Sequence, residues 1–291
     1  MDEATDTTRD FIVRTMTADD MELAIEWAAK EGWNPGINDA RCFRATDPDG
    51  FFIGEWRGEP VGSISAVAYG EHFGFIGLYI VKPEFRGKGL GLRLWQHGIA
   101  YLGTRNVGLD GVVAQQPNYR KSGFKLAYRN IRFQGIVAVD GTRDAARVDD
   151  LADARQLPFG QIAAYDGQFF PAPRERFLNE WINQPDAVAL AKVGDGRIRG
   201  YGVLRRCREG RKIGPLFADD AQIAQALFTA LAARCPAETV ALDVPELNPA
   251  AIALAERHGM TSVFETARMY TREAPDIPLA QLFGVTSFEL G

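Results

Sequence analysis

The sequence predicts an α/β fold that is present twice along the chain. In the first half, β-rich apolar runs alternate with amphipathic segments of helical periodicity, and the same order returns in the second half. A chain of 291 residues is long enough for two domains with cores of their own. We therefore expect one domain at residues 1–135 and another at residues 136–291, each with a mixed β-sheet flanked by helices.

The first half has clear start and turn signals. Thr17 and Asp20 form a capping-box pattern ahead of an amphipathic helix, and Arg57-Gly58-Glu59 joins two apolar runs as a β-hairpin would. A second helix is expected to begin at Leu90. The expected strands are residues 11–14, 51–56, 61–68, 75–81, 107–114 and 126–133, of which the last is expected to close the first half.

The second half repeats this plan at matching intervals. Residues 187–193 and 200–206 form another hairpin pattern around residues 194–196. Residues 213–217 resemble 76–80, residues 223–228 resemble 90–95, and residues 241–244 resemble 108–111. Two copies of one domain, joined by a polar stretch near residues 135–150, account for these repeated segments.

A glycine-rich basic loop is the most informative segment of the chain. Residues 77–92 read GLYIVKPEFRGKGLGL, which predicts a strand, a loop and the start of a helix. The first turn of a helix has unpaired N–H groups and a partial positive charge, so it can hold a phosphate or pyrophosphate. The order of residues excludes a Walker A loop and the dinucleotide-binding fingerprint.

Composition narrows the classes of partner. The net charge of −5 argues against general binding to nucleic acids or membrane surfaces, and no apolar run is long enough to span a bilayer. Three widely spaced cysteines, with no C-x-x-C pair, favour a reducing cytoplasmic location. The three histidines share no ligand-like spacing, and we expect no metal site.

Two motifs resemble those of a known enzyme family. Residues 86–91 fit the pattern Arg-x-x-Gly-x-Gly, which is similar to the coenzyme A pyrophosphate loop of the GNAT N-acetyltransferases. Residues 119–124 fit Tyr-x-x-x-Gly-Phe, which commonly follows the last helix in that family. Segments 31–36, 109–112, 115–119 and 283–291 resemble a bacterial GNAT subgroup whose C-terminal half is a degenerate, YitH-type GNAT domain.

The resemblance implies acetyl-CoA as the cofactor and assigns residues to it. The backbone at Tyr79, Ile80 and Val81 would pair with the pantetheine amides, as an added strand pairs with a sheet edge. Backbone amides of the loop would hold the pyrophosphate. The loop residues are Arg86, Gly87, Lys88, Gly89, Leu90 and Gly91. Asn118 is interpreted either as a further cofactor contact or as the cap of a turn.

The family also implies direct attack of an amine on the thioester, with a general base and a general acid. Tyr119 is the candidate acid that protonates the departing thiolate, the alternative being a packed aromatic residue. The candidate bases are Asp110, Glu71, its neighbour His72 and Glu31, or a chain of water molecules. Because Asp243 occupies the place of Asp110 in the second copy, a structural role for Asp110 is also expected.

The acceptor region is expected in the loop after the first helix. Glu31, Trp33 and Asn34 are the candidate substrate residues, and an ordered turn packed on the core is the alternative. A cluster of basic residues at 197–212 is interpreted as the solvated face of a hairpin, or as a means of attracting an acidic substrate.

The second copy lacks the chemistry of the first. The Arg-Gly-Lys-Gly segment is missing, Asp219 and Asp220 stand at the helix start, and Ala255 occupies the tyrosine position. We expect this half not to bind coenzyme A, because its carboxylates would repel a pyrophosphate.

The sequence thus predicts an acetyl-CoA-dependent N-acetyltransferase for a small-molecule primary amine, with the second half shaping the acceptor pocket. The alternatives are acetylation of protein lysine or N-terminal amines, and a non-catalytic acyl-CoA sensor or scaffold. The intact core pattern of the second half also leaves open its use as a surface for homodimerisation.

Overall fold

The computed structural model describes residues 10–138 and 151–291, which form one continuous thirteen-stranded mixed sheet flanked by helices. The strands run in the order β1-β2-β3-β4-β5-β12-β6-β11-β10-β9-β8-β7, and β13 pairs with β10 beside this path. The first six strands are β1 (Phe11–Thr15), β2 (Phe51–Trp56), β3 (Glu59–Tyr69), β4 (Phe73–Val81), β5 (Asn106–Val112) and β6 (Lys125–Ile136). The others are β7 (Leu151–Asp153), β8 (Val188–Gly194), β9 (Arg197–Arg206), β10 (Arg211–Ala218), β11 (Thr239–Pro245), β12 (Thr261–Tyr270) and β13 (Leu282–Gly284).

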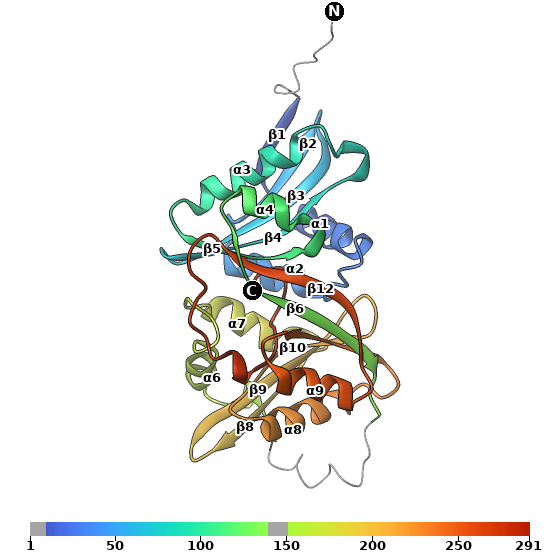
Figure 1. Cartoon of the computed structure of the whole chain (residues 1–291), viewed down its shortest axis with the longest axis vertical. Coiled ribbons are helices and arrows are strands. Elements are labelled where there is room, and N and C mark those ends of the chain that lie inside the picture. The colour runs from blue at the N-terminus through green and yellow to red at the C-terminus, as the bar shows by residue number, and fades with distance from the viewer. Residues whose placement is uncertain (1–9, 139–150) are drawn as a thin grey trace, which may run out of the picture.

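Helices cover both parts of the sheet (Figure 1). They are α1 (Ala18–Lys30), α2 (Asp39–Thr46), α3 (Leu90–Leu102), α4 (Gln116–Lys121), α6 (Phe159–Asp166), α7 (Glu175–Ile182), α8 (Ala221–Ala232) and α9 (Pro249–Arg257). Short 3₁₀ turns are found at η1 (Pro83–Phe85), η2 (Val113–Gln115), η3 (Ala154–Gln156) and η4 (Leu279–Gln281). The predicted capping box of α1 is present: the Thr17 hydroxyl accepts from the Asp20 amide, and the Asp20 carboxylate accepts from the Thr17 amide.

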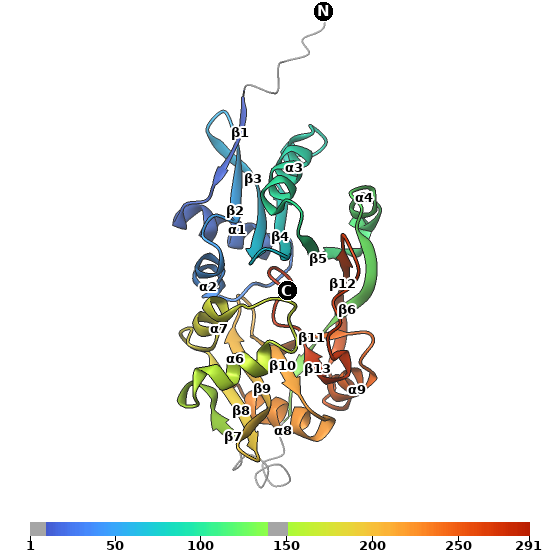
Figure 2. The ribbon, with the colours of Figure 1, turned by 90° about the vertical axis from the view of Figure 1, so that its left-hand side faces the viewer.

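The two halves exchange the strands β6 and β12. β12, from the second half, pairs with β5 and β6, whereas β6, from the first half, pairs with β11 and β12. Figures 1 and 2 show these two strands in the middle of the molecule, between a part that carries β1–β5 and a part that carries β7–β11. The prediction that residues 126–133 close the first half is therefore wrong. The domain boundary after residue 135 falls at the end of β6 and stays a prediction.

Two buried ion pairs fix the register of the exchanged strands. Asp110 on β5 lies opposite Arg268 on β12, and Asp243 on β11 lies opposite Arg132 on β6. Each arginine binds its partner with two hydrogen bonds, at 2.9 and 2.6 Å for Arg268 and at 2.6 and 2.8 Å for Arg132. All four side chains are at most 7% exposed. A one-residue slip would leave buried charges unpaired, so the pairing specifies one register.

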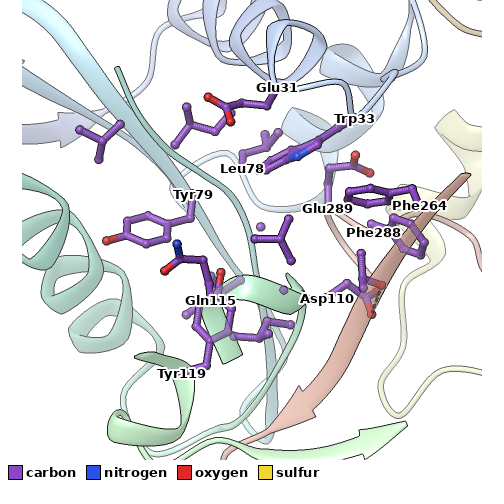
Figure 3. A pocket seen from close by; sticks show the side chains of 18 of the residues that line it. Glu31, Trp33, Leu78, Tyr79, Asp110, Gln115, Tyr119, Phe264, Phe288 and Glu289 are labelled. Atoms are coloured by element: carbon purple, nitrogen blue, oxygen red, sulfur yellow. Dashed lines mark hydrogen bonds between the residues drawn. The ribbon is translucent and has the colours of Figure 1, made fainter. Parts of the chain in front are cut away.

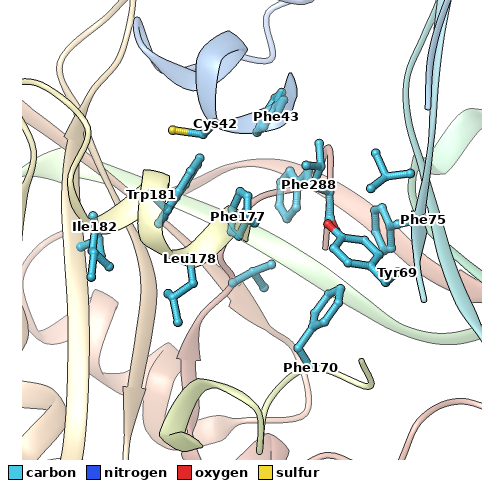
Figure 4. Packing of buried hydrophobic residues seen from close by; sticks show 14 of the residues in the cluster. Cys42, Phe43, Tyr69, Phe75, Phe170, Phe177, Leu178, Trp181, Ile182 and Phe288 are labelled. Atoms are coloured by element: carbon cyan, nitrogen blue, oxygen red, sulfur yellow. The ribbon is translucent and has the colours of Figure 1, made fainter. Parts of the chain in front are cut away.

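A large apolar cluster extends across both halves. It joins α2, β3 and β4 of the first half to α6 and α7 of the second, and Figure 4 shows part of it. Phe43 of α2 stacks on Trp181 of α7 with ring centroids 6.2 Å apart, and Phe170 meets Tyr69 edge to face at 4.7 Å. The two halves therefore share core as well as strands.

We predict that the buried pairs carry much of the stability of this arrangement. Replacing Arg268 or Arg132 by methionine leaves a buried carboxylate without its partner and should lower the free energy of unfolding by about 3–5 kcal/mol. The matched control is Arg129→Met, since Arg129 on β6 and Glu265 on β12 join the two exchanged strands to each other through a pair whose side chains are 41% and 44% exposed. That change should cost less than about 1 kcal/mol. Urea unfolding followed by circular dichroism measures both, and equal losses would contradict the account.

Candidate active site

The site begins where two parallel strands move apart. β4 and β5 pair only from Phe73 to Ile76 and from Asn106 to Leu109. Beyond that point β4 bulges: its register with β3 shifts between Ser63 and Ser65, and Leu78 takes a positive φ of 45°. A non-glycine residue rarely adopts such a backbone, and such strain is concentrated at functional sites. The strands therefore leave a gap at the carboxyl end of β4.

A cavity of about 380 Å³ lies in this gap (Figure 3). The first half contributes Glu31, Trp33, Ile76, Gly77, Leu78, Tyr79, Ile80, Val81, Arg86, Leu109, Asp110, Gly111, Val112, Gln115 and Tyr119. The second half contributes Phe264 and Thr266 from β12, and Phe288 and Glu289 from the segment after β13. The cavity is thus built from both halves.

The predicted cofactor residues lie along one side of this cavity and in the loop beside it. Tyr79, Ile80, Val81 and Arg86 line it. The loop residues Gly87 and Gly89 both have positive φ, at 75° and 78°. A side-chain atom added at either position would meet no described atom within 4 Å beyond its chain neighbours. Gly89 is the N-cap of α3 and, within the described residues, no side chain caps that helix start. The N–H groups of the first turn are therefore available to an anion.

Arg86 is held at the base of the loop. Its Nε donates to the Val81 carbonyl oxygen at 2.7 Å, and its guanidinium pairs with Glu31. Both side chains of that pair are partly exposed, at 50% and 35%. Glu31, predicted as a substrate residue, thus lines the cavity at the end nearest the glycine loop.

Tyr119 lies on α4 with its ring held between two elements. The ring packs on Trp95 of α3 at 5.6 Å between centroids. On the other side, a side-chain carbon at Gly111 would come within 2.1 Å of the ring, so this position in β5 needs glycine. Burial, followed by the charge of Tyr79, raises the pKa of Tyr119 to about 12. The hydroxyl consequently keeps its proton at neutral pH. Asn118 is exposed, does not line the cavity and donates to the Gln115 side chain at 2.7 Å, which favours its interpretation as part of a turn.

Asp110 lines the cavity but is already engaged. Besides Arg268, its carboxylate accepts from the Asn130 side chain at 2.8 Å. Burial raises the pKa of Asp110, and the charge and hydrogen bonds of Arg268 oppose that rise. The equivalent pairing of Asp243 with Arg132 supports the structural role that the sequence had left open.

Other sequence-predicted residues are placed away from the cavity. Glu71 and His72 are exposed in the turn before β4, at the opposite end of that strand, so a catalytic role for Glu71 has no support in the geometry. Asn34 does not line the cavity either; its side chain exchanges two hydrogen bonds, each 2.9 Å long, with the backbone of Glu209. Asn34 lies outside the cavity because these two bonds connect the loop after α1 to the β9–β10 turn.

The basic cluster at residues 197–212 is only partly a solvated face. Arg205 and Lys212 are 0% and 2% exposed, so the prediction is wrong for these two. Arg205 pairs with buried Asp39 at 3.0 Å, and the Lys212 ammonium donates to the Asn34 carbonyl oxygen at 3.0 Å. Both contacts cross between the halves, which explains why these charges are buried.

Sequence reasoning missed Gln115 and all four lining residues of the second half, Phe264, Thr266, Phe288 and Glu289. It also did not single out the lining residues of β4 and β5 that precede or flank the predicted ones, namely Ile76, Gly77, Leu78, Leu109, Gly111 and Val112. The segment 283–291 stood out in the sequence as typical of a subgroup, but nothing in its local pattern places it beside β4. In the structure, a side-chain carbon at Gly77 would lie 2.1 Å from the Glu289 carbonyl oxygen. The absence of a side chain at Gly77 in β4 therefore allows the backbone of Glu289 to come this close to the strand.

The corresponding gap in the second half is filled by the chain itself. β10 and β11 pair only from Arg211 to Ile213 and from Val240 to Leu242. Beyond them, β13 pairs with β10, and the Val285 amide donates to the Asp243 carbonyl oxygen at 2.8 Å. At the start of α8, the Asp220 carboxylate accepts from the amides of Gln222 and Ile223. The donors that could hold a phosphate are thus already satisfied.

The fold and the two motifs define a class of acyl-transferring enzymes. Residues 17–124 match the acetyltransferase (GNAT) family, and residues 162–284 match an acetyltransferase (GNAT) domain. The chain is 31% identical over 275 residues to the holothin acyltransferase of Pseudoalteromonas sp. (strain SANK 73390), covering 94% of this chain and 92% of that protein. The chain therefore belongs to the GNAT acetyltransferase family and carries a second, GNAT-like domain in its C-terminal half.

Further proteins are similar to part or all of the chain. The uncharacterised N-acetyltransferase YitH of Bacillus subtilis is 28% identical over 161 residues, covering 54% of this chain and 56% of that protein. A solved structure from Pyrococcus horikoshii, whose description reads "putative acetyltransferase", superposes with a TM-score of 0.82 at 21% identity, covering 97% and 96% of the two chains. A tandem GNAT protein from the clavulanic acid biosynthesis pathway has a TM-score of 0.59 at 13% identity, covering 91% and 100%. These structures share the fold.

Within residues 10–138 and 151–291, no helix is long and apolar enough to cross a membrane. No group of three or more His, Cys, Asp or Glu residues there is placed to hold a metal ion.

We predict that Gly77 is required for the segment after β13 to reach the cavity. Gly77→Ala should lower the free energy of unfolding by about 1–3 kcal/mol, because the new methyl group must displace the backbone of Glu289. The matched control is Gly160→Ala in α6, where an added methyl group meets no described atom within 4 Å. Thermal melts compare the two variants. Equal melting temperatures would contradict the contact between β4 and this segment.

Proposed function

We propose that the protein is an acetyl-CoA-dependent N-acetyltransferase whose acceptor is a small-molecule primary amine. The observation that carries the proposal is the cavity between β4 and β5, which is lined by residues of both halves and by Arg86 at the start of the glycine-rich loop, beside a helix start that no described side chain caps. Enzymes of this family use acetyl-CoA or another acyl-CoA and act on an amine acceptor. In this proposal the first half binds the cofactor, and the second half does not.

The residues present fit the cofactor. The loop from Arg86 to Gly91 offers backbone amides and a positive charge for the pyrophosphate, and Gly87 and Gly89 leave room for its close approach. The edge of β4 at Tyr79, Ile80 and Val81, freed from β5, offers backbone groups to the pantetheine arm. The bound thioester supplies an activated acyl group.

Tyr119 is proposed as the general acid. Tyr119 lines the cavity, and its raised pKa keeps the proton on the hydroxyl oxygen until a leaving thiolate needs it. Trp95 and the missing side chain at Gly111 set the orientation of the ring. This arrangement also supports catalysis over the sensor alternative, which needs the glycine loop but no proton donor.

A small acceptor is favoured over a protein because the second half covers the acceptor end. Phe264, Phe288 and Glu289 form the wall opposite Tyr79 and Tyr119 (Figure 3). The name of the Pseudoalteromonas relative refers to acylation of holothin. Holothin and a panel of small primary amines are therefore the first acceptors to test.

We predict that Gly89→Glu weakens acetyl-CoA binding by about 100-fold, or roughly 2.8 kcal/mol, because a carboxylate enters the proposed pyrophosphate site. The matched control is Gly196→Glu in the β8–β9 turn. Its φ of 74° is close to the 78° of Gly89, and its surroundings are equally open, so strain and added charge are the same. Isothermal titration calorimetry measures both. Equal weakening in the two variants, or none in Gly89→Glu, would contradict the cofactor assignment.

We predict that Tyr119→Phe lowers kcat about 100-fold, within the range typical for loss of a general acid. The dissociation constant for acetyl-CoA should stay unchanged, because the ring remains packed on Trp95. Steady-state kinetics with the best acceptor of the panel, together with calorimetry, separate the two effects. An unchanged kcat would exclude Tyr119 as the proton donor.

A further inference from the structure

The acceptor end of the cavity combines flat apolar walls with a carboxylate. Trp33, Phe264 and Phe288 lie together with Glu289 on one side of the cavity, facing Tyr79 and Tyr119 across it (Figure 3). The rings of Phe264 and Phe288 are 6.4 Å apart. Aromatic faces of this kind bind planar apolar groups and attract cations.

Glu289 is the unusual member of this group. Its residue is 4% exposed, yet its Oε2 atom has no hydrogen-bond partner among the described residues. The other carboxylates that line the cavity are engaged, Asp110 by Arg268 and Glu31 by Arg86. Leaving a buried acceptor unpaired costs roughly 1–3 kcal/mol, so an unpaired carboxylate in a cavity indicates a place for a donor.

The backbone around Glu289 is held firmly. The Ser287 hydroxyl accepts from the amides of Glu289 and Leu290, at 3.2 and 3.1 Å. The Tyr69 hydroxyl donates to the Leu290 carbonyl oxygen at 3.0 Å, and Arg174 donates to the Thr286 hydroxyl at 3.0 Å. Thr286 and Leu290 are 3% and 0% exposed. The carboxylate is thus presented from a fixed backbone, as a functional group requires.

We propose that Glu289 is the general base for the acceptor amine, and that the acceptor is a primary amine carried on a flat, aromatic body. This inference rests on the proposed function. It assigns the base to the second half of the chain, whereas the sequence offers Asp110, Glu71, His72 or Glu31, or a chain of water molecules. The aromatic walls hold the body of the acceptor, and the carboxylate of Glu289 receives its ammonium group.

The proton balance of the step is as follows. An alkylammonium ion gives one proton to Glu289, which passes it to water, and the nitrogen is left with its electron pair. The nitrogen then bonds to the acyl carbon while the carbon–sulfur bond breaks and its electron pair leaves with sulfur. Tyr119 gives its proton to sulfur, and the second nitrogen proton restores Tyr119. One proton is released for each amide formed.

The charged groups around Glu289 come from several elements. Arg132 on β6 and Arg205 on β9 both interact electrostatically with it, after their stronger interactions with Asp243 and Asp39. Glu31 and Asp110 line the same cavity from the loop after α1 and from β5. A substitution at Glu289 should therefore be charge-matched with a distant control.

The test uses two aromatic amines of different basicity. Benzylamine is protonated at neutral pH, as alkylamines are, whereas aniline is not, so benzylamine alone needs a base before attack. Glu289→Gln should lower kcat/KM for benzylamine about 100-fold and for aniline by less than about tenfold. The benzylamine rate of the variant should rise with pH as free amine accumulates. Calorimetry should also show that Glu289→Gln weakens benzylamine binding to the protein without acetyl-CoA.

Glu256→Gln on the exposed face of α9 is the matched control for the charge change and should behave as wild type. If Glu289→Gln acetylates benzylamine at the wild-type rate, or loses both amines equally, the assignment of the base is overturned. If the wild type binds acetyl-CoA but acetylates neither amine, the aromatic acceptor is overturned while the cofactor site stands. Failure of the wild type to bind acetyl-CoA would instead overturn the proposed function itself.

Discussion

The structure depends on two buried ion pairs that join strands from different halves. Asp110 with Arg268 and Asp243 with Arg132 occupy equivalent places, and each pair binds a strand of one half to the exchanged strand of the other. Separating either pair would leave a buried charge without its partner in a region of low dielectric. Separating a half from the exchanged strand of the other half therefore has a large free-energy cost. The single thirteen-stranded sheet follows from this exchange, and so does the position of β12 beside the cavity.

The two halves share one fold but differ in the gap between their parallel strands and in the helix start beside it. In the first half, the divergence of β4 from β5 leaves a cavity beside an uncapped helix. In the second half, the equivalent divergence is closed by β13, and Asp220 caps the helix. The segment that closes the second gap continues to the first one, where Phe288 and Glu289 complete the cavity wall. The half without the glycine-rich loop therefore contributes to the cavity of the other half, through the same segment that closes its own gap.

Local features could be predicted from the sequence, and features set by distant contacts could not. The loop at residues 86–91 and the position of Tyr119 depend on residues that are close in the sequence, so the sequence pattern predicts both. The exchange of β6 and β12 depends on register between segments far apart, and a charge such as Asp110 does not reveal its partner. For the same reason, the local sequence predicts Arg205 and Lys212 as solvated and Glu71 as catalytic, whereas the structure buries the first two and leaves Glu71 exposed away from the cavity. Glu289 was missed because nothing near it in the chain resembles a catalytic motif.

The central claim is that two GNAT-like halves form one acyltransferase site. The most direct measurement is the stoichiometry of acetyl-CoA binding to the whole chain by isothermal titration calorimetry. The account predicts one molecule bound per chain, because β13 and Asp220 already occupy the second gap and helix start. Two molecules per chain would contradict the closed second half, and no binding would contradict the assignment of the first.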